Sequence, residues 1–573
     1  MLAFIQNLIT AFPGSLRDTL LVGLGFSFLA IVFPRTMERI FRTVESPLCR
    51  LSKSKALVIL LLFTAVIVVR LAVVRQLPMP LPRVHDEYSY LLLGDTLAHG
   101  RLANPTHPMW ISFETFHVNW IPTYSSKYPP GQGVVLAIGQ LLGHPWIAVL
   151  LSVGAMCAAI VWMLQAWLPA RWALLGGMLA GLKFGIASYW VNSYWGGAVA
   201  AMGGALVLGA MARIVRHAWT RDALLLGVGI AILANSRPYE GLIFCIPISA
   251  WFLWWLAGKT NSRVPLHKRM ARVFVPLAIV LSLTVGFLGY YNWRLTGNAL
   301  LFPYVLHART YDSVGLFLWQ HPRESLPYRN KQLADFYDTW EREQYDNTWQ
   351  DVQELTREKL RRWVPTYLWL GAILALPGLL FTLFDRKMRL PLAIALVSAV
   401  GSLLAIWSMP HYVAPLTCVT FLLLVQAMRH LRTIRPAGRP LGIALSWAAV
   451  ALLGTLVGSE VSAHHCDALE WTCRGDIGRA TIAERLSGLP GKHLVLVHYD
   501  EDHDVHEHEW VYNGAEIDSA KVLWARDISP QQNAKLFAYF NDRRIWLVNP
   551  DEDSTELVPY EPGSAAVSFD NKQ

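Results

Sequence analysis

Charged residues are scarce in this chain. Only 16% of its 573 residues are Asp, Glu, Lys or Arg, whereas soluble domains contain about one quarter. Apolar residues make up 54%, and the mean hydropathy is +0.33. The lack of charge excludes an ordinary soluble protein and indicates an integral membrane protein. The sequence also lacks internal repeats and low-complexity tracts.

A basic stripe and a nucleic-acid-binding motif are also lacking, although the net charge is +9. Cysteine is rare, with six residues. Four are expected to stay unpaired within the membrane or on its cytoplasmic side: Cys49, Cys157, Cys245 and Cys418. Cys466 and Cys473 lie in the tail, where a disulfide in an oxidising compartment and two free thiols are the alternatives.

Apolar runs dominate the first 459 residues. Twelve of them are long enough, or nearly so, to cross a bilayer of about 30 Å. They lie near residues 17–34, 56–75, 146–167, 171–189, 197–215, 222–236, 239–257, 272–291, 364–384, 389–408, 411–430 and 440–459. With twelve spans, the short loops rich in Lys and Arg all fall on one side, which the positive-inside rule makes cytoplasmic. The sequence therefore predicts a mainly α-helical, polytopic membrane protein.

Three longer segments then face outward: residues 76–145, residues 292–363 and the tail from residue 460. The second is polar, aromatic and largely helical, as lids and binding loops often are. Residues 460–573 are predicted to form a small soluble α/β domain after a transmembrane domain of residues 1–459. Its expected strands are "HLVLVHY", "KVLWARD" and "RIWLVNP", and its expected helices cover about 477–487 and 530–541.

The first outward segment begins with "RVHDEYSYLLLGDTLAHGRL" (83–102). His85, Asp86 and Glu87 directly follow an apolar run and precede a predicted amphipathic helix that ends at Gly100. One interpretation is ordinary solvated charge, or an Asp at a helix start. The other is functional, because a carboxylate held at headgroup height can act as a general base toward a lipid-linked substrate.

The same segment ends in "SSKYPPGQG" (125–133). Lys127 is its last cation, and Pro129 and Pro130 fix the chain direction behind it. A lysine at the interface either binds phosphate or extends toward lipid headgroups. One outward segment thus supplies both an acid pair and a cation.

These motifs resemble the GT-C glycosyltransferases, most closely the branch of protein O-mannosyltransferases and aminoarabinose transferases. The shared features are an outward "DE" after an early span, a helix ending in "HGRLANP", and a Lys-Pro-Pro-like element in which Tyr128 is here interposed. The motif likeness covers about residues 85–131. It implies inverting transfer of a sugar from a polyprenyl-phosphate donor, with Asp86 as the base, Glu87 assisting, and Lys127 contacting the donor phosphate.

Other candidate residues lie on the predicted outward side. Arg237 and Glu240 form a structural ion pair or serve the donor phosphate. His411 and Tyr412 begin a span, where related enzymes often place a polar residue near the donor. Lys183 lies inside the fourth span, where a cation either has a function or extends to the interface. The donor-phosphate candidates are therefore Lys127, Arg237, His411 and Lys183, and the supporting candidates are His85, Tyr128, Glu240 and Tyr412.

The cofactor is unidentified, and a divalent metal is one option. Asp86 and Glu87 are its candidate ligands, since such cations prefer oxygen donors. The run "HYDEDHDVHEHEW" (498–510) contains His498, His503, His506 and His508. Its spacing matches no defined metal site, so it is interpreted as an acidic surface loop, with weak zinc or calcium binding as the alternative. Three first-segment histidines are expected to be structural, with assistance to Asp86 as the alternative: His99, His107 and His117.

The predicted function is a membrane glycosyltransferase of the bacterial inner membrane, with its active-site loops and tail outside the cytoplasm. Its predicted partners are a polyprenyl-phosphate sugar, an unidentified lipid, glycan or protein acceptor, and membrane lipids, but not nucleic acid. A flippase or transporter for a lipid-linked anion is the first alternative. Such proteins have broken or polar helices at mid-membrane and pseudo-symmetric halves, whereas the ionisable groups here gather at the outward edge. A non-catalytic assembly protein is the second alternative, and it would not explain the ionisable residues of the first outward segment.

Overall fold

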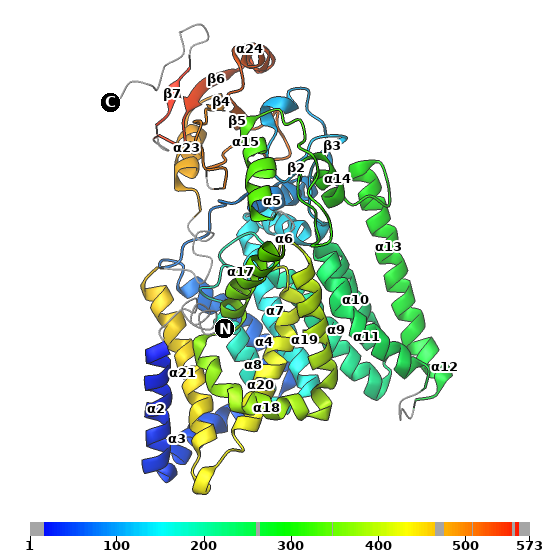
Figure 1. Ribbon diagram of the computed structural model, residues 1–573, viewed down its shortest axis with the longest axis vertical. Helices are drawn as coiled ribbons and strands as arrows, with labels where there is room; N and C mark the ends of the chain where they lie inside the picture. Colours follow the sequence, from blue (N-terminus) through cyan, green and yellow to red (C-terminus); the bar gives the residue numbers. More distant parts are fainter. Residues whose placement is uncertain are drawn as a thin grey trace.

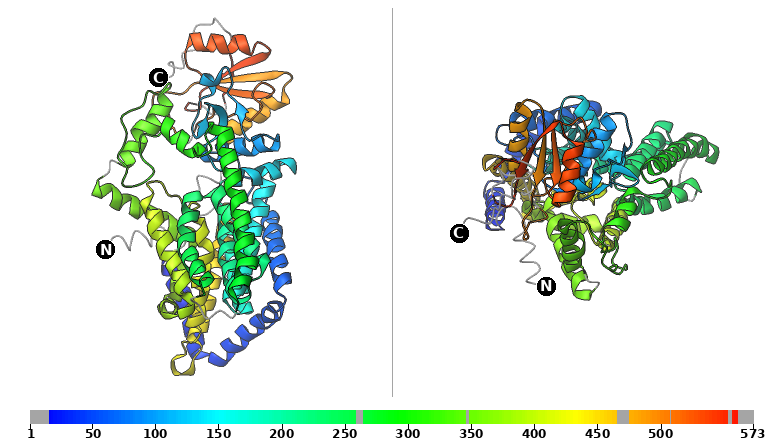
Figure 2. Two further views of the ribbon diagram at one scale, coloured as in Figure 1. Left: turned by 90° about the vertical axis from the view of Figure 1, so that its right-hand side faces the viewer. Right: turned by 90° about the horizontal axis from the view of Figure 1, so that it is seen from above.

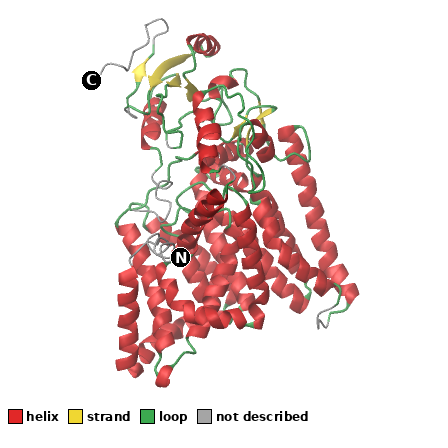
Figure 3. Ribbon diagram, in the orientation of Figure 1, coloured by secondary structure: helices red, strands yellow, loops and turns green. Residues whose placement is uncertain are grey.

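A bundle of long helices carries a small sheet domain at one end (Figures 1 and 3). The computed structural model describes residues 16–258, 264–345, 348–464, 475–506, 508–552 and 556–560. Cys466 and Cys473 lie outside these described residues.

The bundle is built from the apolar runs of the sequence. Its helices are α2 (Leu16–Val32), α3 (Pro34–Leu51), α4 (Lys55–Ala72), α7 (Pro145–Trp167), α8 (Ala170–Phe184), α9 (Gly197–His217), α10 (Thr220–Ser236), α11 (Pro238–Leu256), α12 (Leu266–Arg269), the π-helix η2 (Met270–Phe274), α13 (Val275–Thr296), α17 (Trp349–Tyr367), the 3₁₀ helix η4 (Leu370–Ala375), α18 (Leu376–Phe384), the 3₁₀ helix η5 (Arg386–Met388), α19 (Arg389–Leu404), the 3₁₀ helix η6 (Ala414–Leu416), α20 (Thr417–Leu431), the 3₁₀ helix η7 (Pro436–Gly438) and α21 (Leu441–Ser462).

The mainly helical membrane architecture is confirmed. Among the described residues, eight helices are long and apolar enough to cross a membrane, or up to ten if each of two bent helix pairs is one span. Two further predicted runs form α8 and α10, which have 15 and 17 residues. The total of twelve spans therefore stays a prediction.

Helix α9 lies at the centre of the bundle because its small residues allow close approach. A Cβ on Gly204 would lie 2.4 Å from the carbonyl oxygen of Pro415, and one on Gly209 would lie 2.4 Å from the Trp162 ring. Small residues at such crossings let helix backbones pack closely inside a membrane. The packing fixes the helix ends that support the outward segments.

The first outward segment contains α5 (His85–Ala98), the 3₁₀ helix η1 (Trp110–Phe113), strands β1 (Asn104–Pro105), β2 (Val118–Asn119) and β3 (Thr123–Ser126), and α6 (Pro130–Leu141). The strands form an antiparallel sheet in the order β1-β3-β2. Helix α5 ends before Gly100, whose φ of +72° suits glycine. The expected amphipathic character of α5 is wrong, because Tyr88, Tyr90, Leu92 and Leu93 are buried on different sides of it.

The second outward segment is helical, as predicted. It contains α14 (Pro303–Thr310), α15 (Lys331–Ala334), the π-helix η3 (Asp335–Trp340), α16 (Glu341–Gln344) and most of α17. Helix α17 begins with a capping box. The Thr348 hydroxyl accepts a hydrogen bond from the backbone amide of Asp351, and the Asp351 carboxylate accepts one from the backbone amide of Thr348. These helices lie over the end of the bundle that carries the sheet domain (Figure 2).

The tail is an α/β unit whose elements match the predicted ones. It contains α23 (Ile477–Gly488), β4 (Lys492–Val497), β5 (Val522–Arg526), α24 (Pro530–Tyr539), β6 (Arg543–Val548) and β7 (Val558–Pro559). The sheet order is β5-β4-β6-β7, with β4 parallel to β5 and β6, and β7 antiparallel to β6. Ser529 caps α24 by accepting from the Gln532 amide.

The tail sheet shares a hydrophobic core with the first outward segment. On one face, Leu494 and Leu496 pack in a cluster with Leu92 of α5. On the other face, Val495 and Val497 pack against α23. Side chains alternate between the two faces of a strand, so β4 is buried on both sides. The tail therefore closes over α5.

We predict that filling the contact between α5 and α6 destabilises the protein. A Cβ on Gly133 would lie 2.2 Å from Cγ of Leu93. Gly133→Val should lower the free energy of unfolding by about 1–3 kcal/mol, the usual cost of overpacking, measured by thermal unfolding in detergent. Gly286→Ala in α13 is the control, since its Cβ meets no atom within 4 Å. Equal stability of the two variants would contradict the packing argument.

Candidate active site

A cavity of about 450 Å³ lies at the end of the bundle that carries the sheet domain. Its walls come from the start of α5, His117, the turn before α6, Trp195, the second outward segment, residues 406–412 and one tail residue. The ionisable groups that line it are Asp86, Lys127, Asp312, Glu341, Glu358, Lys359, Arg362, His85, His117, His411 and His506. Segments distant in the sequence therefore meet at one polar cavity.

Asp86 lies in the first turn of α5, where the helix dipole favours a carboxylate. Its Oδ1 accepts a hydrogen bond from the Tyr128 hydroxyl and lies 3.8 Å from Nδ1 of His117. Its Oδ2 has no hydrogen-bond partner among the described residues. The side chain is 22% exposed, so the carboxylate is fixed on one side and open to the cavity on the other.

Lys127 is buried at the cavity wall beside aromatic rings. Its Nζ lies 5.0 Å from the ring centroid of Tyr304 and 5.5 Å from that of Tyr128. Within the described part of the chain, its ammonium group forms no hydrogen bond or ion pair. Burial lowers the pKa of Lys127, and the charges of Asp312, Asp86 and Glu341 oppose this effect. Pro130, the first residue of α6, braces the turn behind it, as expected.

Tyr128, the residue interposed before the prolines, lies at the centre of the site. Its hydroxyl donates to Asp86, and its ring stacks on Tyr90 with 4.2 Å between centroids. Its backbone carbonyl accepts a hydrogen bond of 3.2 Å from the Tyr291 hydroxyl. The departure from the Lys-Pro-Pro pattern thus contributes a contact to the predicted base.

Glu87 does not share the cavity with Asp86. It is fully buried, and its carboxylate accepts from the backbone amides of Tyr194 at 3.0 Å, Arg83 at 3.0 Å and Val84 at 3.4 Å. Burial raises its pKa to about 7, against the effect of these hydrogen bonds. Consecutive helical residues point about 100° apart, so the expected acid pair is not formed. Glu87 instead connects α5 to the chain before α9.

His85 connects α5 to the tail. Its Nδ1 lies 2.8 Å from the Tyr512 hydroxyl, and its Nε2 lies 2.7 Å from the carbonyl oxygen of Val505. Because a carbonyl only accepts, Nε2 carries the proton and Nδ1 accepts from Tyr512. The ring also stacks on Phe116 at 4.3 Å. His85 therefore lines the cavity as a neutral anchor.

Two buried carboxylates of the second outward segment escaped the sequence analysis. Burial raises the pKa of Asp312, whereas His307 and Lys127 lower it. Nδ1 of His307 lies 3.4 Å from Oδ1 of Asp312. The lowering effects are larger, so the pKa of Asp312 lies below its usual value. Burial and the charge of Asp312 raise the pKa of Glu341 well above its usual value. In the sequence these two residues lie in a polar, aromatic loop, and no motif there links them to Lys127.

The remaining candidates lie at different depths. His411 lines the cavity, 3.3 Å from the Tyr189 hydroxyl, and Tyr412 lines it beside His411. Arg237 lies behind Tyr412, with its guanidinium carbon 3.9 Å from that ring centroid. In the part of the chain that the structure describes, Arg237 forms no ion pair with Glu240. The structure therefore brings His411 and Tyr412 to Asp86 and Lys127, and places Arg237 and Glu240 one layer away.

Lys183 is also outside the cavity wall. It is buried near the end of α8. The structure thus separates it from Lys127, with which the sequence grouped it as a phosphate contact.

The interpretation of residues 498–510 as an acidic surface loop fits Glu501, Asp502 and Asp504, which are exposed, but not Val505, Glu509 and Trp510, which are buried. His498 lies 2.9 Å from Asp527, and His503 lies 2.8 Å from Asp551. His506 lines the cavity. In the described ranges, no group of three or more His, Cys, Asp or Glu residues is arranged to hold a metal ion.

The remaining first-segment histidines have local partners. His99 lies 2.9 Å from the carbonyl oxygen of Asp95, and His107 lies 3.1 Å from Asp518 of the tail. His117 alone lies near Asp86. The structural interpretation therefore fits His99 and His107, and assistance to Asp86 stays open only for His117.

Solved structures share this architecture. The ArnT protein from Cupriavidus metallidurans in the apo state has a TM-score of 0.50 and 14% identity, over 86% of this chain and 93% of that one. The protein has the GT-C fold.

Two further similarities are weaker. The same Cupriavidus protein bound to undecaprenyl phosphate has a TM-score of 0.46 and 12% identity, over 86% of this chain and 93% of that one. An Archaeoglobus fulgidus oligosaccharyltransferase has a TM-score of 0.44 and 11% identity, over 76% of this chain, which spans 62% of that protein. No protein-family model matches the sequence, and neither does any curated protein.

We predict that acid weakens the contact between this GT-C core and the tail through His85. Burial lowers the pKa of His85 well below 6.5, so below pH 6.5 the unfolded chain binds a proton that the folded protein excludes. Stability should then fall by about 1.4 kcal/mol per pH unit below 6.5 for each such histidine. His85→Gln should show a shallower loss from about pH 7.5 to about pH 5.5 in thermal unfolding. Parallel pH profiles would rule out this linkage.

Proposed function

We propose that the protein is a membrane glycosyltransferase that transfers a sugar from a polyprenyl-phosphate donor to an acceptor in the cavity. One observation carries the proposal: Lys127 is buried without an ion-pair partner among the described residues and faces the same cavity as Asp86. A buried cation needs an anionic partner. The GT-C fold supports the enzyme class, and the motif likeness of residues 85–131 supports the type of donor.

The proposed reaction needs a base and a stabilised leaving group. The acceptor hydroxyl attacks the anomeric carbon while its proton passes to Asp86. The bond between that carbon and the phosphate oxygen breaks, and the lipid phosphate leaves with the electron pair. The transition state resembles an oxocarbenium ion, as in glycoside hydrolysis. Attack from the side opposite the phosphate inverts the configuration.

Lys127 stabilises the negative charge that develops on the departing phosphate. A cation in a water-poor cavity is more effective there than in bulk solvent. Tyr128 is a positioning residue, because its hydroxyl holds Oδ1 of Asp86 and leaves Oδ2 for the acceptor. His411 and Tyr412 line the same cavity, whereas Glu87 serves as a buried structural anchor.

The proposed topology places the cavity and the tail outside the cytoplasm of a bacterial inner membrane. The basic loops between the predicted spans support this orientation. Residues 1–459 form the transmembrane unit and residues 460–573 the outward unit in this proposal. The acceptor is a lipid, a glycan or a protein. The position of the cavity at one end of the bundle favours transfer over transport.

Asp86→Asn should abolish transfer. Loss of the base costs about 10²–10⁴-fold in rate. The donor is first identified as the polyprenyl-phosphate sugar that accumulates in a deletion strain, by mass spectrometry of its lipids. Transfer from that lipid is then compared in membranes with equal protein levels. Asp335→Asn is the control, because this outward carboxylate pairs with Lys331 away from the cavity wall. Full activity of Asp86→Asn would eliminate the assignment of the base.

Lys127→Met should weaken binding of the lipid phosphate. A charge-assisted hydrogen bond contributes about 1.5–3 kcal/mol, which corresponds to about a tenfold or greater loss of affinity. Native mass spectrometry with undecaprenyl phosphate measures this change on the purified protein. Lys535→Met, on the exposed face of α24, is the matched control. Unchanged affinity of Lys127→Met would remove Lys127 from the phosphate site.

A further inference from the structure

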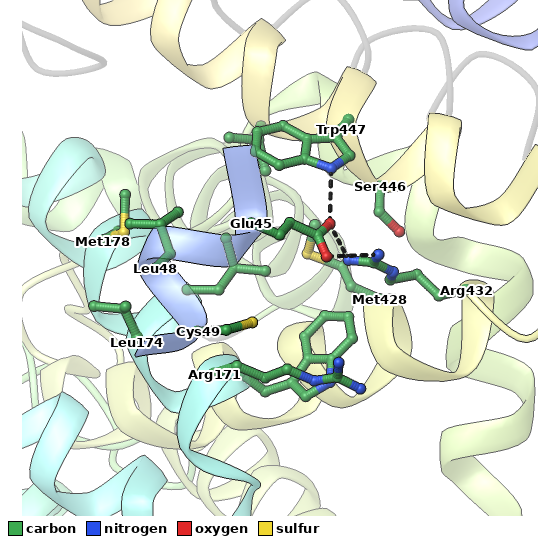
Figure 4. Close-up of a pocket in the computed structure, with 13 residues that line it drawn as sticks. Glu45, Leu48, Cys49, Arg171, Leu174, Met178, Met428, Arg432, Ser446 and Trp447 are labelled. Carbon is green, nitrogen blue, oxygen red and sulfur yellow. Dashed lines mark hydrogen bonds and ion pairs between the residues drawn. The ribbon is translucent and has the colours of Figure 1, made fainter. Parts of the chain in front are cut away.

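A second, smaller pocket lies at the opposite end of the bundle from the cavity. It has a volume of about 90 Å³ and is enclosed by α3, α8, α20 and α21 (Figure 4). None of its lining residues belongs to the cavity that contains Asp86. The pocket therefore requires a separate explanation.

One end of this pocket is a fixed polar cluster. Arg432 donates two hydrogen bonds to Glu45, at 2.7 and 3.0 Å, and the indole nitrogen of Trp447 donates to the same carboxylate at 3.0 Å. The guanidinium carbon of Arg432 also lies 5.4 Å from the ring centroid of Trp172. Glu45 is thus occupied by Arg432 and offsets only one positive charge.

Arg171 adds a second cation to the same end. Figure 4 shows its guanidinium on the side of the pocket where Arg432 lies. It has no hydrogen-bond or ion-pair partner within the described ranges, and its side chain is exposed. Arg171, Arg432 and Glu45 together carry a net charge of +1. The polar end therefore has one cation available for an anionic ligand.

The other end of the pocket is apolar. Leu174 and Met178 line it from α8, and Leu48 lines it from α3. Figure 4 places Leu174 and Met178 away from the two guanidinium groups. The pocket therefore has the polarity of an amphiphile, with a cation at one end and an aliphatic wall at the other.

Helix α3 places this pocket at a membrane surface. It is bent by 113° from α2 and therefore crosses the end of the bundle. One side buries Met37 and Phe41 against α21, while Ile40 and Val44 are exposed beside them. Four exposed arginines lie on the other side: Arg35, Arg39, Arg42 and Arg50. This division is typical of helices that lie in the headgroup region of anionic membranes.

We propose that this pocket is a binding site for an anionic phospholipid. The phosphate binds Arg171, and the start of an acyl chain lies along Leu174 and Met178. A free phosphate leaves the apolar wall exposed to water, and a zwitterionic lipid brings its own cation to Arg171. With the topology proposed above, the lipid belongs to the cytoplasmic leaflet. The binding itself needs neither that orientation nor glycosyl transfer.

Native mass spectrometry of the purified full chain tests the site. The probes are phosphatidylglycerol and phosphatidylcholine with identical acyl chains, and inorganic phosphate as a competitor. The wild-type protein should retain phosphatidylglycerol preferentially. Arg171→Gln should weaken this binding about tenfold, the loss expected for one charge-assisted contact. Met178→Trp, which fills the apolar end, should weaken both lipids while leaving the cation in place.

Arg221→Gln is the matched control, because Arg221, like Arg171, is an exposed arginine in the first turn of a helix. It does not line the pocket and should bind phosphatidylglycerol like the wild type. Equal retention of the two lipids, or unchanged binding in Arg171→Gln, would overturn the proposal. Displacement by millimolar inorganic phosphate would also overturn it, because the site would then recognise a free anion. If a variant lost sugar transfer but bound phosphatidylglycerol like the wild type, the result would bear only on the proposed function.

Discussion

The hydrogen bond from Tyr128 to Asp86 joins the two ends of the first outward segment. Tyr128 is held by its stack on Tyr90 and by the Tyr291 hydroxyl, and Asp86 is held by the start of α5. Because Lys127 directly precedes Tyr128, the same contact sets the position of the cation. A change in the tilt of α5 would thus move Asp86, the proposed base, and Lys127, the proposed phosphate contact, together. Their relative geometry is more constrained than either would be on a free loop.

The tail domain maintains that constraint from outside. His85 binds Tyr512 and Val505, and Arg526 donates to the carbonyl oxygen of Glu114 at 2.7 Å. Arg526 also forms a buried ion pair with Glu509 at 2.7 Å. A buried pair costs desolvation of both charges, so its geometry must be well satisfied. These polar contacts fix the orientation of the tail, while the shared core around Leu92 buries apolar side chains of both units.

Glu87 gives α5 a third fixed point on the side of the bundle. Its carboxylate receives three backbone amides, one of them from Tyr194 before α9. Three consecutive residues of α5 therefore face three different parts of the protein. His85 contacts the tail, Asp86 faces the cavity, and Glu87 contacts the bundle. The cluster of ionisable groups in the sequence thus reflects a junction of three structural units rather than one shared site.

The sequence predicted elements whose signals are local. Hydropathy located the membrane helices, and short runs of β-branched and aromatic residues located β4, β5 and β6. Asp86 and Lys127 were also identified locally, because each lies at an element boundary near the expected membrane edge. The direction of Glu87 could not be inferred from adjacency, since neighbouring helical residues face different ways. Asp312, Glu341 and His506 reach the cavity only through long-range packing, which no local pattern encodes.

The charge balance of the cavity explains how it can receive an anion with few free cations. Lys359 donates to the carbonyl oxygens of Leu403 and Ala405, and is therefore already engaged. Burial and the charge of Asp312 raise the pKa of Glu341 well above its usual value, which disfavours the ionised form of this carboxyl group. Lys127 then faces fewer negative charges than the number of acids in the wall suggests. A phosphate that binds beside Lys127, as proposed, would add a negative charge near Glu341 and would further disfavour its ionised form.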